Sequence, residues 1–72
     1  MRNTKETAIL LELGAKIRAI RIEKGYTQTE FANIIGKDQP SVNRLERGAV
    51  NPGYLYLYEI ADGLGISVKE FI

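Results

Sequence analysis

The chain has 72 residues, ten lysines and arginines, nine acidic residues and a formal net charge of +1. Because it contains no cysteine and no histidine, disulfide bonds, thiolate chemistry and the usual zinc sites are excluded. No apolar run approaches the roughly 20 residues that span a bilayer, and no signal peptide is visible. We therefore expect one small cytoplasmic domain with no membrane partner.

The charge is distributed unevenly along the chain. Residues 1–51 contain nine basic and six acidic residues, a net charge of +3, whereas residues 52–72 contain one lysine and three acids, a net charge of −2. A basic first part and an acidic end are expected when one face of a protein meets phosphate and another does not. Ordinary solvated surface charge explains so small a difference equally well.

A first helix is predicted up to Gly25. Asn3 or Thr4 can cap it, with Glu6 three residues beyond Asn3, and Lys24 suits its C-terminus. At 100° per residue, one face of this helix carries the predicted core residues Ile9, Leu10, Leu13, Ile17 and Ile20.

A short second helix is predicted between Thr27 and Gly36. Thr27 as N-cap and Glu30 three residues later form a capping box. Tyr26 and Phe31 are placed to form a hydrophobic staple across the cap. Gly36 closes the helix, where a left-handed residue is wanted.

The third predicted helix begins at the N-cap Asp38 and ends at Gly48, before the turn Asn51-Pro52-Gly53. At 100° per residue its two faces differ. The outer face carries Gln39, Pro40, Asn43, Arg44 and Arg47; the inner face carries Ser41, Val42 and Leu45. Any exposed helix has a polar face, but this one contains no acid. Long side chains that form paired hydrogen bonds suit the major groove of DNA.

The last two predicted helices have weaker patterns. Residues 54–58 alternate tyrosine and leucine like a strand, but no second strand exists to pair with them. At helical spacing one face carries Tyr54, Leu57, Ile60, Ala61 and Leu64, which favours a fourth helix. A capping box and a staple predict the fifth, from the residues Ile66, Ser67, Glu70 and Phe71. We therefore expect an all-α, compact domain of five helices.

The span from about Leu13 to Phe71 resembles the phage Cro/repressor-type (XRE-like) helix-turn-helix family. The matching residues stand at unbroken spacing: Arg21, Gly25, Gln28, Glu30, Ala32, Gly36, Ser41, Arg44, Glu46 and Gly48, then Ile60-Ala61 and Leu64-Gly65-Ile66-Ser67. This resemblance implies a repressor-like fold in which helix 38–47 reads double-stranded DNA. It covers residues 13–72. We expect residues 1–12 to be an N-terminal extension that lengthens the first helix, rather than an arm along DNA or a partner-binding segment.

The resemblance implies base-reading roles for Gln39, Pro40, Asn43 and Arg44. Gln39 matches the first base-reading position, where a glutamine can bond adenine through two hydrogen bonds. Arg44 favours guanine, with a phosphate contact as the alternative. Pro40 replaces a residue that is long in many relatives, which leaves apolar contact with a thymine methyl group.

The resemblance also implies phosphate-binding roles for Gln28, Lys37, Arg47 and Asn51. Gln28 can in addition brace the side chain of Gln39. Lys37 stands where an apolar or small residue is common, so a staple is lost and a cation is gained near the DNA backbone.

Two further matches are structural. Arg21 and Glu46 match a partly buried ion pair that ties the first helix to the third, so both are excluded from base reading. Ala32 allows the second and third helices to approach closely.

The implied function is a sequence-specific transcriptional regulator, a repressor or autoregulator. Because one such domain buries only roughly 600–1,000 Å² on DNA, a homodimer on a symmetric operator is expected. Leftover apolar residues form two candidate dimer or partner surfaces: Leu55, Tyr58, Phe71 and Ile72, and separately Leu11, Ala15 and Ile22.

Two alternatives remain open. One is an antitoxin or adaptor whose main task is to bind a protein partner, with DNA binding for autoregulation; the other is a domain of this fold that has lost DNA binding. Gln28, Lys37, Gln39 and Arg44 argue against the loss of DNA binding. No nucleophile–base pair, phosphate-cradling glycine loop or small-molecule pattern is present, so we expect no enzyme activity and no cofactor.

Overall fold

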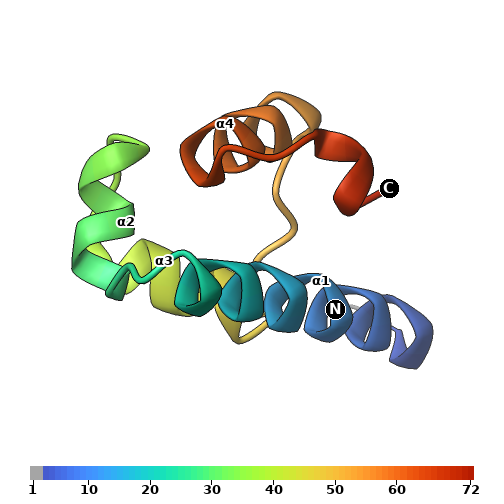
Figure 1. The fold of residues 1–72 in the computed structure, drawn as a ribbon. Helices are drawn as coiled ribbons and strands as arrows, with labels where there is room; N and C mark the ends of the chain where they lie inside the picture. Colours follow the sequence, from blue (N-terminus) through green and yellow to red (C-terminus); the bar gives the residue numbers. More distant parts are fainter. Residues whose placement is uncertain (1–2) are drawn as a thin grey trace.

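The computed structural model describes residues 3–72, which form four α-helices and one turn of 3-10 helix (Figure 1). The elements are α1 (Thr4–Glu23), α2 (Gln28–Ile34), α3 (Gln39–Glu46), α4 (Tyr54–Leu64) and the 3-10 turn η1 (Val68–Glu70). The predicted all-α class is confirmed for the described residues, and the segment 54–58 is helical rather than extended.

The predicted count of five helices is wrong, because the last element is a single 3-10 turn. Backbone N–H groups of Glu70 and Phe71 donate to the carbonyl groups three residues earlier, at 3.0 and 2.9 Å. This is the hydrogen-bond spacing of a 3-10 helix, which seldom extends beyond three or four residues. Ser67 caps this turn as predicted, but its hydroxyl accepts from the N–H of Lys69, and the predicted box with Glu70 is not formed.

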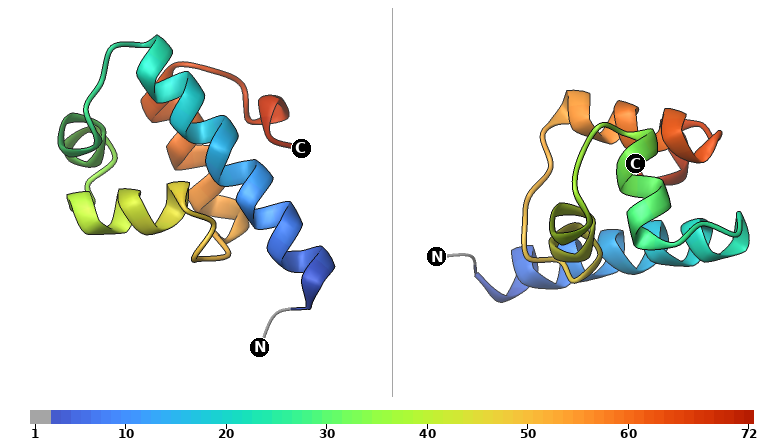
Figure 2. Two further views of the ribbon diagram at one scale, coloured as in Figure 1. Left: turned by 90° about the horizontal axis from the view of Figure 1, so that it is seen from below. Right: turned by 90° about the vertical axis from the view of Figure 1, so that its left-hand side faces the viewer.

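The helices surround one core. α1 runs along one side of the molecule and α4 along the other, with α2 at one end and α3 beside α1 (Figures 1 and 2). Each helix contributes buried side chains to this core: Ile17 from α1, Phe31 and Ala32 from α2, Val42 and Leu45 from α3, and Ile60 and Leu64 from α4. The short helices α2 and α3 are therefore held by packing on two longer ones.

The predicted caps of the first three helices are present. The side chains of Asn3 and Thr27 accept hydrogen bonds from the N–H groups of Glu6 and Glu30, at 2.8 and 3.0 Å, and both boxes are reciprocated. The backbone N–H of Thr27 lowers the pKa of the Glu30 carboxyl. Asp38 caps α3 by accepting from the N–H of Ser41 at 2.9 Å. Local spacing thus sets where these helices begin.

Two glycines set the position of α3. Gly36 has φ +69° and turns the chain between α2 and α3, as predicted. Gly14 lies where α1 meets the last turn of α3, and a Cβ there would lie 2.5 Å from the carbonyl oxygen of Glu46. Any larger residue at position 14 would push α3 away from α1.

Three sequence predictions are wrong. Ile9 is 53% exposed rather than buried, although the adjacent Leu10 is only 7% exposed, because Ile9 lies at the rim of a hollow beside Phe71 and Ile72. Tyr54 is 63% exposed at the start of α4, where its ring packs edge-on against Tyr58. Phe71, predicted to be surface, packs partly buried against the core. Leu11, Ile22, Leu55, Tyr58 and Ile72 are exposed as predicted.

Within residues 3–72, no helix is both long enough and apolar enough to cross a membrane.

Candidate nucleic-acid interface

The outer face of α3 is polar and its inner face is apolar. Val42 and Leu45 are fully buried against the core. Gln39, Pro40, Arg44 and Arg47 are exposed, and Asn43 is half-buried. Five of the predicted contact residues therefore lie on the outer side of one short helix.

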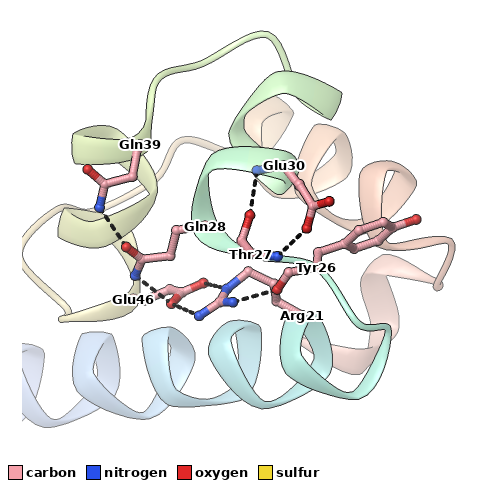
Figure 3. Close-up of polar contacts among 7 residues, drawn as sticks. All are labelled: Arg21, Tyr26, Thr27, Gln28, Glu30, Gln39 and Glu46. Atoms are coloured by element: carbon pink, nitrogen blue, oxygen red, sulfur yellow. Dashed lines mark hydrogen bonds and ion pairs between the residues drawn. The ribbon is translucent and has the colours of Figure 1, made fainter.

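A buried ion pair holds this helix against α1. Arg21 contacts Glu46 through Nε to Oε2 at 2.6 Å and donates from Nη2 to Oε1 at 3.0 Å. The exposed fractions of the two side chains are 8% and 2%. Arg21 Nη1 also donates to the carbonyl of Tyr26 at 2.7 Å, so one guanidinium joins α1, α3 and the turn before α2 (Figure 3). The predicted ion pair is present, and it is more deeply buried than expected.

A chain of hydrogen bonds runs from this ion pair to the start of α3 (Figure 3). Gln28 donates from Nε2 to Glu46 Oε1 at 3.0 Å, and Gln39 donates from Nε2 to Gln28 Oε1 at 2.7 Å. A carboxylate only accepts hydrogen bonds. Gln28 must therefore turn its NH₂ group to Glu46 and its oxygen to Gln39, which turns the NH₂ group of Gln39 inward.

These hydrogen bonds determine which atoms of the Gln39 amide remain available to a ligand. Its Oε1 and its second N–H make no hydrogen bond within the described residues. One free acceptor and one free donor are what a glutamine uses on the N6 and N7 atoms of adenine. The predicted brace by Gln28 is thus present in the structure.

Arg44 lies on the outer face of α3 and forms one side-chain hydrogen bond of its own. Its Nη2 donates to the hydroxyl of Ser41 at 3.2 Å. Because this single bond is to a neutral group at the helix surface, most guanidinium donors of Arg44 stay available. Arg47 lies at the C-cap of α3 and is exposed.

A hollow of about 250 Å³ lies beside α3. It is lined by Lys37, Ser41, Arg44, Val50, Asn51, Pro52, Gly53 and Tyr56. Lys37 and Asn51, two of the predicted phosphate ligands, meet Arg44 here, whereas Arg47 and Gln28 do not line it. The hollow therefore carries two cationic side chains and no carboxylate.

Tyr56 also lines this hollow, and the sequence did not predict it as a site residue. The ammonium of Lys37 lies 5.0 Å from the centre of its ring, a cation–π distance. Burial, followed by the negative charges of Glu59 and Asp38, raises the pKa of the Tyr56 hydroxyl. Tyr56 is partly buried against the core, one helical turn before the buried Ile60, so helical spacing alone marks it as a residue at the edge of the core.

Neither acid of this segment belongs to the outer face of α3: Glu46 is buried, and Asp38 keeps its negative charge at the N-cap. Glu46 is paired with Arg21. Asp38 is occupied as a cap, and hydrogen bonds from the side chain and backbone of Ser41 lower the pKa of its carboxyl. The outer face of α3 is consequently cationic and rich in hydrogen-bond donors.

Two short helices joined at a left-handed glycine, the second packed by its apolar side and polar outward, define a helix-turn-helix domain. The chain belongs to the Helix-turn-helix family HTH_3, whose model matches residues 17–71. It is a DNA-binding transcriptional regulator of that family, which is not a family of enzymes.

Relatives and solved structures agree with this assignment. The chain is 40% identical over 60 residues to the uncharacterized HTH-type transcriptional regulator y4dJ of Sinorhizobium fredii, covering 83% of this chain and 78% of that protein. It is 40% identical over 57 residues to YazB of Bacillus subtilis, an uncharacterized HTH-type transcriptional regulator, covering 79% and 83%.

The fold is also similar to that of the restriction-modification controller protein C.AhdI from Aeromonas hydrophila. The TM-score is 0.86 at 30% identity, over 92% of this chain and 96% of that one. The clp gene regulator ClgR from Corynebacterium glutamicum gives a TM-score of 0.84 at 30% identity, over 88% and 81%.

Proposed function

We propose that the protein is a sequence-specific repressor or autoregulator that reads the major groove of double-stranded DNA with residues 38–47. One observation carries the proposal: the Gln39 amide is held in a fixed orientation by Gln28 and Glu46 on an otherwise acid-free face. A surface that only needed to be soluble gains nothing from such a chain of bonds.

Base reading is assigned to the side chains on the outer face of α3. Gln39 offers a donor and an acceptor to adenine, and Arg44 offers paired donors to O6 and N7 of guanine. Asn43 lies between them, and Pro40 contributes apolar contact with a thymine methyl group. Each good paired contact discriminates against a wrong base by about 1–3 kcal/mol.

The residues assigned to DNA phosphates lie on either side of the base-reading side chains of α3. Lys37 and Asn51 border the hollow beside α3, and Arg47 is exposed at the far end of the helix. Gln28 keeps one N–H that is not used by Glu46, and that N–H is assigned to phosphate. Such contacts fix the register of the protein on DNA and make its affinity depend on salt.

The active form on DNA is a homodimer bound to a symmetric operator. A single domain of this size buries roughly 600–1,000 Å² on DNA, too little for a tight regulatory site. Two copies would contact half-sites about 34 Å apart, one turn of the double helix. The dimer acts as a repressor or autoregulator by occupying the promoter that it covers.

A protein-binding adaptor is the second candidate function. The exposed Leu11 and Ile22, at 51% and 50%, are the observation in its favour, since a partner that covered them would bury apolar surface. This role and DNA binding use different faces of the molecule.

Selection of bound duplexes from a random pool tests the DNA-reading proposal. The selected duplex and a scrambled control are then titrated across a salt series. We expect a two-fold symmetric consensus that is bound at least about 10³-fold more tightly than the control. Weak binding without a consensus would overturn the proposal and leave the adaptor role.

A further inference from the structure

Helix α1 has a second apolar face, opposite the one that enters the core. We call it the outer stripe and define it by the residues Ala8, Leu11, Ala15, Ala19 and Ile22. At 100° per residue its members lie within about 40° of Ala15, whereas Leu13 and Ile17 lie about 160° away. All five residues of the outer stripe are exposed, and α1 lies in front of α4 when seen from this side (Figure 2, left).

The residue types of the outer stripe suit contact with another helix. Two alanines at its middle, Ala15 and Ala19, allow the axes of two helices to approach closely, and Leu11 and Ile22 are apolar anchors on either side of them. From Ala8 to Ile22 the stripe is about 21 Å long at 1.5 Å per residue. Apolarity alone does not identify the occupant.

Charged residues along one edge of the outer stripe indicate which partner would cover it. Lys5, Glu12, Lys16 and Glu23 lie about 60–100° from Ala15 on the same side, and all four are exposed. Within residues 3–72 none of them forms an ion pair or a side-chain hydrogen bond. The opposite edge carries Thr7, Gly14 and Arg18 and no acid.

We propose that the outer stripe of α1 binds the outer stripe of a second copy of this chain, with the two helices antiparallel. A two-fold axis perpendicular to the helices at Ala15 brings the charged edges of both copies together. Glu12 then faces the partner's Lys16, and Lys5 faces the partner's Glu23. Each of these pairs is offset by only about 3 Å along the axis and occurs twice.

A parallel arrangement does not give this match. It places the charged edge of one helix against the edge where Gly14 packs on α3 and Arg18 is the only charged residue, so Lys5 and Lys16 have no acidic partner and the two acids share one cation. Only the antiparallel pair satisfies four acids and four lysines at once, and opposite charges across a helix contact set orientation.

The competing face lacks such self-complementarity. Leu55, Tyr58 and Ile72 are exposed on it. The surface residues of this part of the chain comprise Glu59, Asp62 and Glu70 but only one cation, Lys69. Two copies joined there would bring like charges together. The antiparallel contact through α1 is therefore the favoured self-association surface.

Pairing of α1 helices is a property of the chain without DNA, and only its bearing on a symmetric operator rests on the proposed function. Sedimentation velocity on DNA-free protein measures it, with the variants Glu12→Lys and Lys16→Glu. Either change turns two attractive pairs into two repulsive ones and should weaken dimerisation at least about tenfold. An equimolar mixture of the two variants restores all pairs and should dimerise again.

Two controls make the outcome specific to this contact. The double variant Glu12→Lys/Lys16→Glu should dimerise like the wild type, because its pairs are reversed but intact. Glu59→Lys on α4 should leave dimerisation unchanged, and circular dichroism checks that α1 keeps its helicity in every variant.

Three results would overturn the inference. The first is a wild type that stays monomeric up to about 1 mM. The second is a dimer that is unaffected by either charge change, and the third is a mixture that fails to recover. A protein that is monomeric but still selects a DNA sequence would contradict only the pairing of α1 helices. A protein that dimerises through α1 but selects no DNA sequence would contradict only the proposed base reading.

Discussion

The side chain of Gln39 donates a hydrogen bond to the side chain of Gln28 at 2.7 Å, although the two residues belong to different helices. Gln28 is itself oriented by Glu46, which can only accept. The direction of every hydrogen bond from Gln39 to Glu46 is therefore determined by the buried carboxylate of Glu46, the last residue of α3. The ion pair that joins α1 to α3 also determines which atoms of Gln39 face outward.

Replacing Gln28 by alanine tests this coupling. Without its brace, the Gln39 amide is free to rotate and to present either end to a base. We expect Gln28→Ala to reduce discrimination at the base pair read by Gln39 and to lower the salt slope by about one unit for its lost phosphate contact. The measurement is a titration of the selected operator and of a version with that base pair changed, over a salt series.

Gln39→Ala is the matched control for Gln28→Ala. It should remove the same discrimination, by about 1–3 kcal/mol, with the salt slope intact. If Gln28→Ala keeps the full preference for the original base pair, the brace does not orient Gln39.

Removing one partner of the buried ion pair should destabilise the domain, whereas replacing both partners by apolar residues should not. Glu46→Ala leaves the Arg21 charge buried without its partner and should cost about 3–5 kcal/mol, against roughly 4–11 kcal/mol for a domain of this size. The double variant Arg21→Met/Glu46→Leu should recover most of this loss in urea unfolding. It should still lose base discrimination, since Gln28 then has no acceptor to orient it.

Two outcomes for the double variant would contradict this prediction. A double variant as unstable as Glu46→Ala would show that packing around this site, not the uncompensated charge, determines stability. A double variant with full base discrimination would show that Gln28 is oriented by something other than Glu46.

The role of Arg44 is decided by comparing two substitutions. If its guanidinium reads guanine, Arg44→Ala should cost about 1–3 kcal/mol and relax specificity at one base pair. Arg44→Lys keeps the charge but loses the fork of paired donors, so it should relax specificity at an unchanged salt slope. Equal losses by Arg44→Ala on the selected and random duplexes, with Arg44→Lys behaving like the wild type, would make Arg44 a phosphate contact.

The features that the sequence predicted correctly depend on short-range spacing. The boxes at Asn3 and Thr27 and the cap at Asp38 involve residues three apart, which nearly determine the local geometry. The buried positions Ile17, Val42 and Leu45 follow from the helical period. The ion pair and the brace of Gln39 came instead from family resemblance, because no local rule joins residues 25 or 11 positions apart.

The errors have physical causes of the same kind. Periodicity identified the face of α1 on which Ile9 lies, but not how wide the covered part of that face is in the first turns, where Leu10 is buried and Ile9 is not. The contact of Lys37 with Tyr56 depends on the path of the α3–α4 loop, which brings them together. Gly14 has no side chain and therefore gave no periodic signal, although its missing Cβ permits α1 and α3 to touch.

The contact between Lys37 and Tyr56 should matter for DNA binding in general. Lys37→Ala is expected to weaken binding to the selected and random duplexes alike and to lower the salt slope by about one unit. Tyr56→Leu removes the ring that positions Lys37 and should cost about 0.5–1 kcal/mol of affinity, whereas Tyr56→Phe keeps the ring and serves as the control. An unchanged salt slope in Lys37→Ala would remove this lysine from the interface.

The acid stability of the domain should depend in part on Asp38. Hydrogen bonds from the side chain and backbone of Ser41 lower the pKa of this carboxyl in the folded state. Its contribution is therefore complete above the ordinary carboxyl pKa of about 4 and is lost as the pH falls through the lowered value. Asn caps a helix as well as Asp does and carries no titrating proton. Asp38→Asn should accordingly lose less stability than the wild type between about pH 5 and pH 2 in urea unfolding. Parallel pH curves for the two proteins would show that this cap works without its charge.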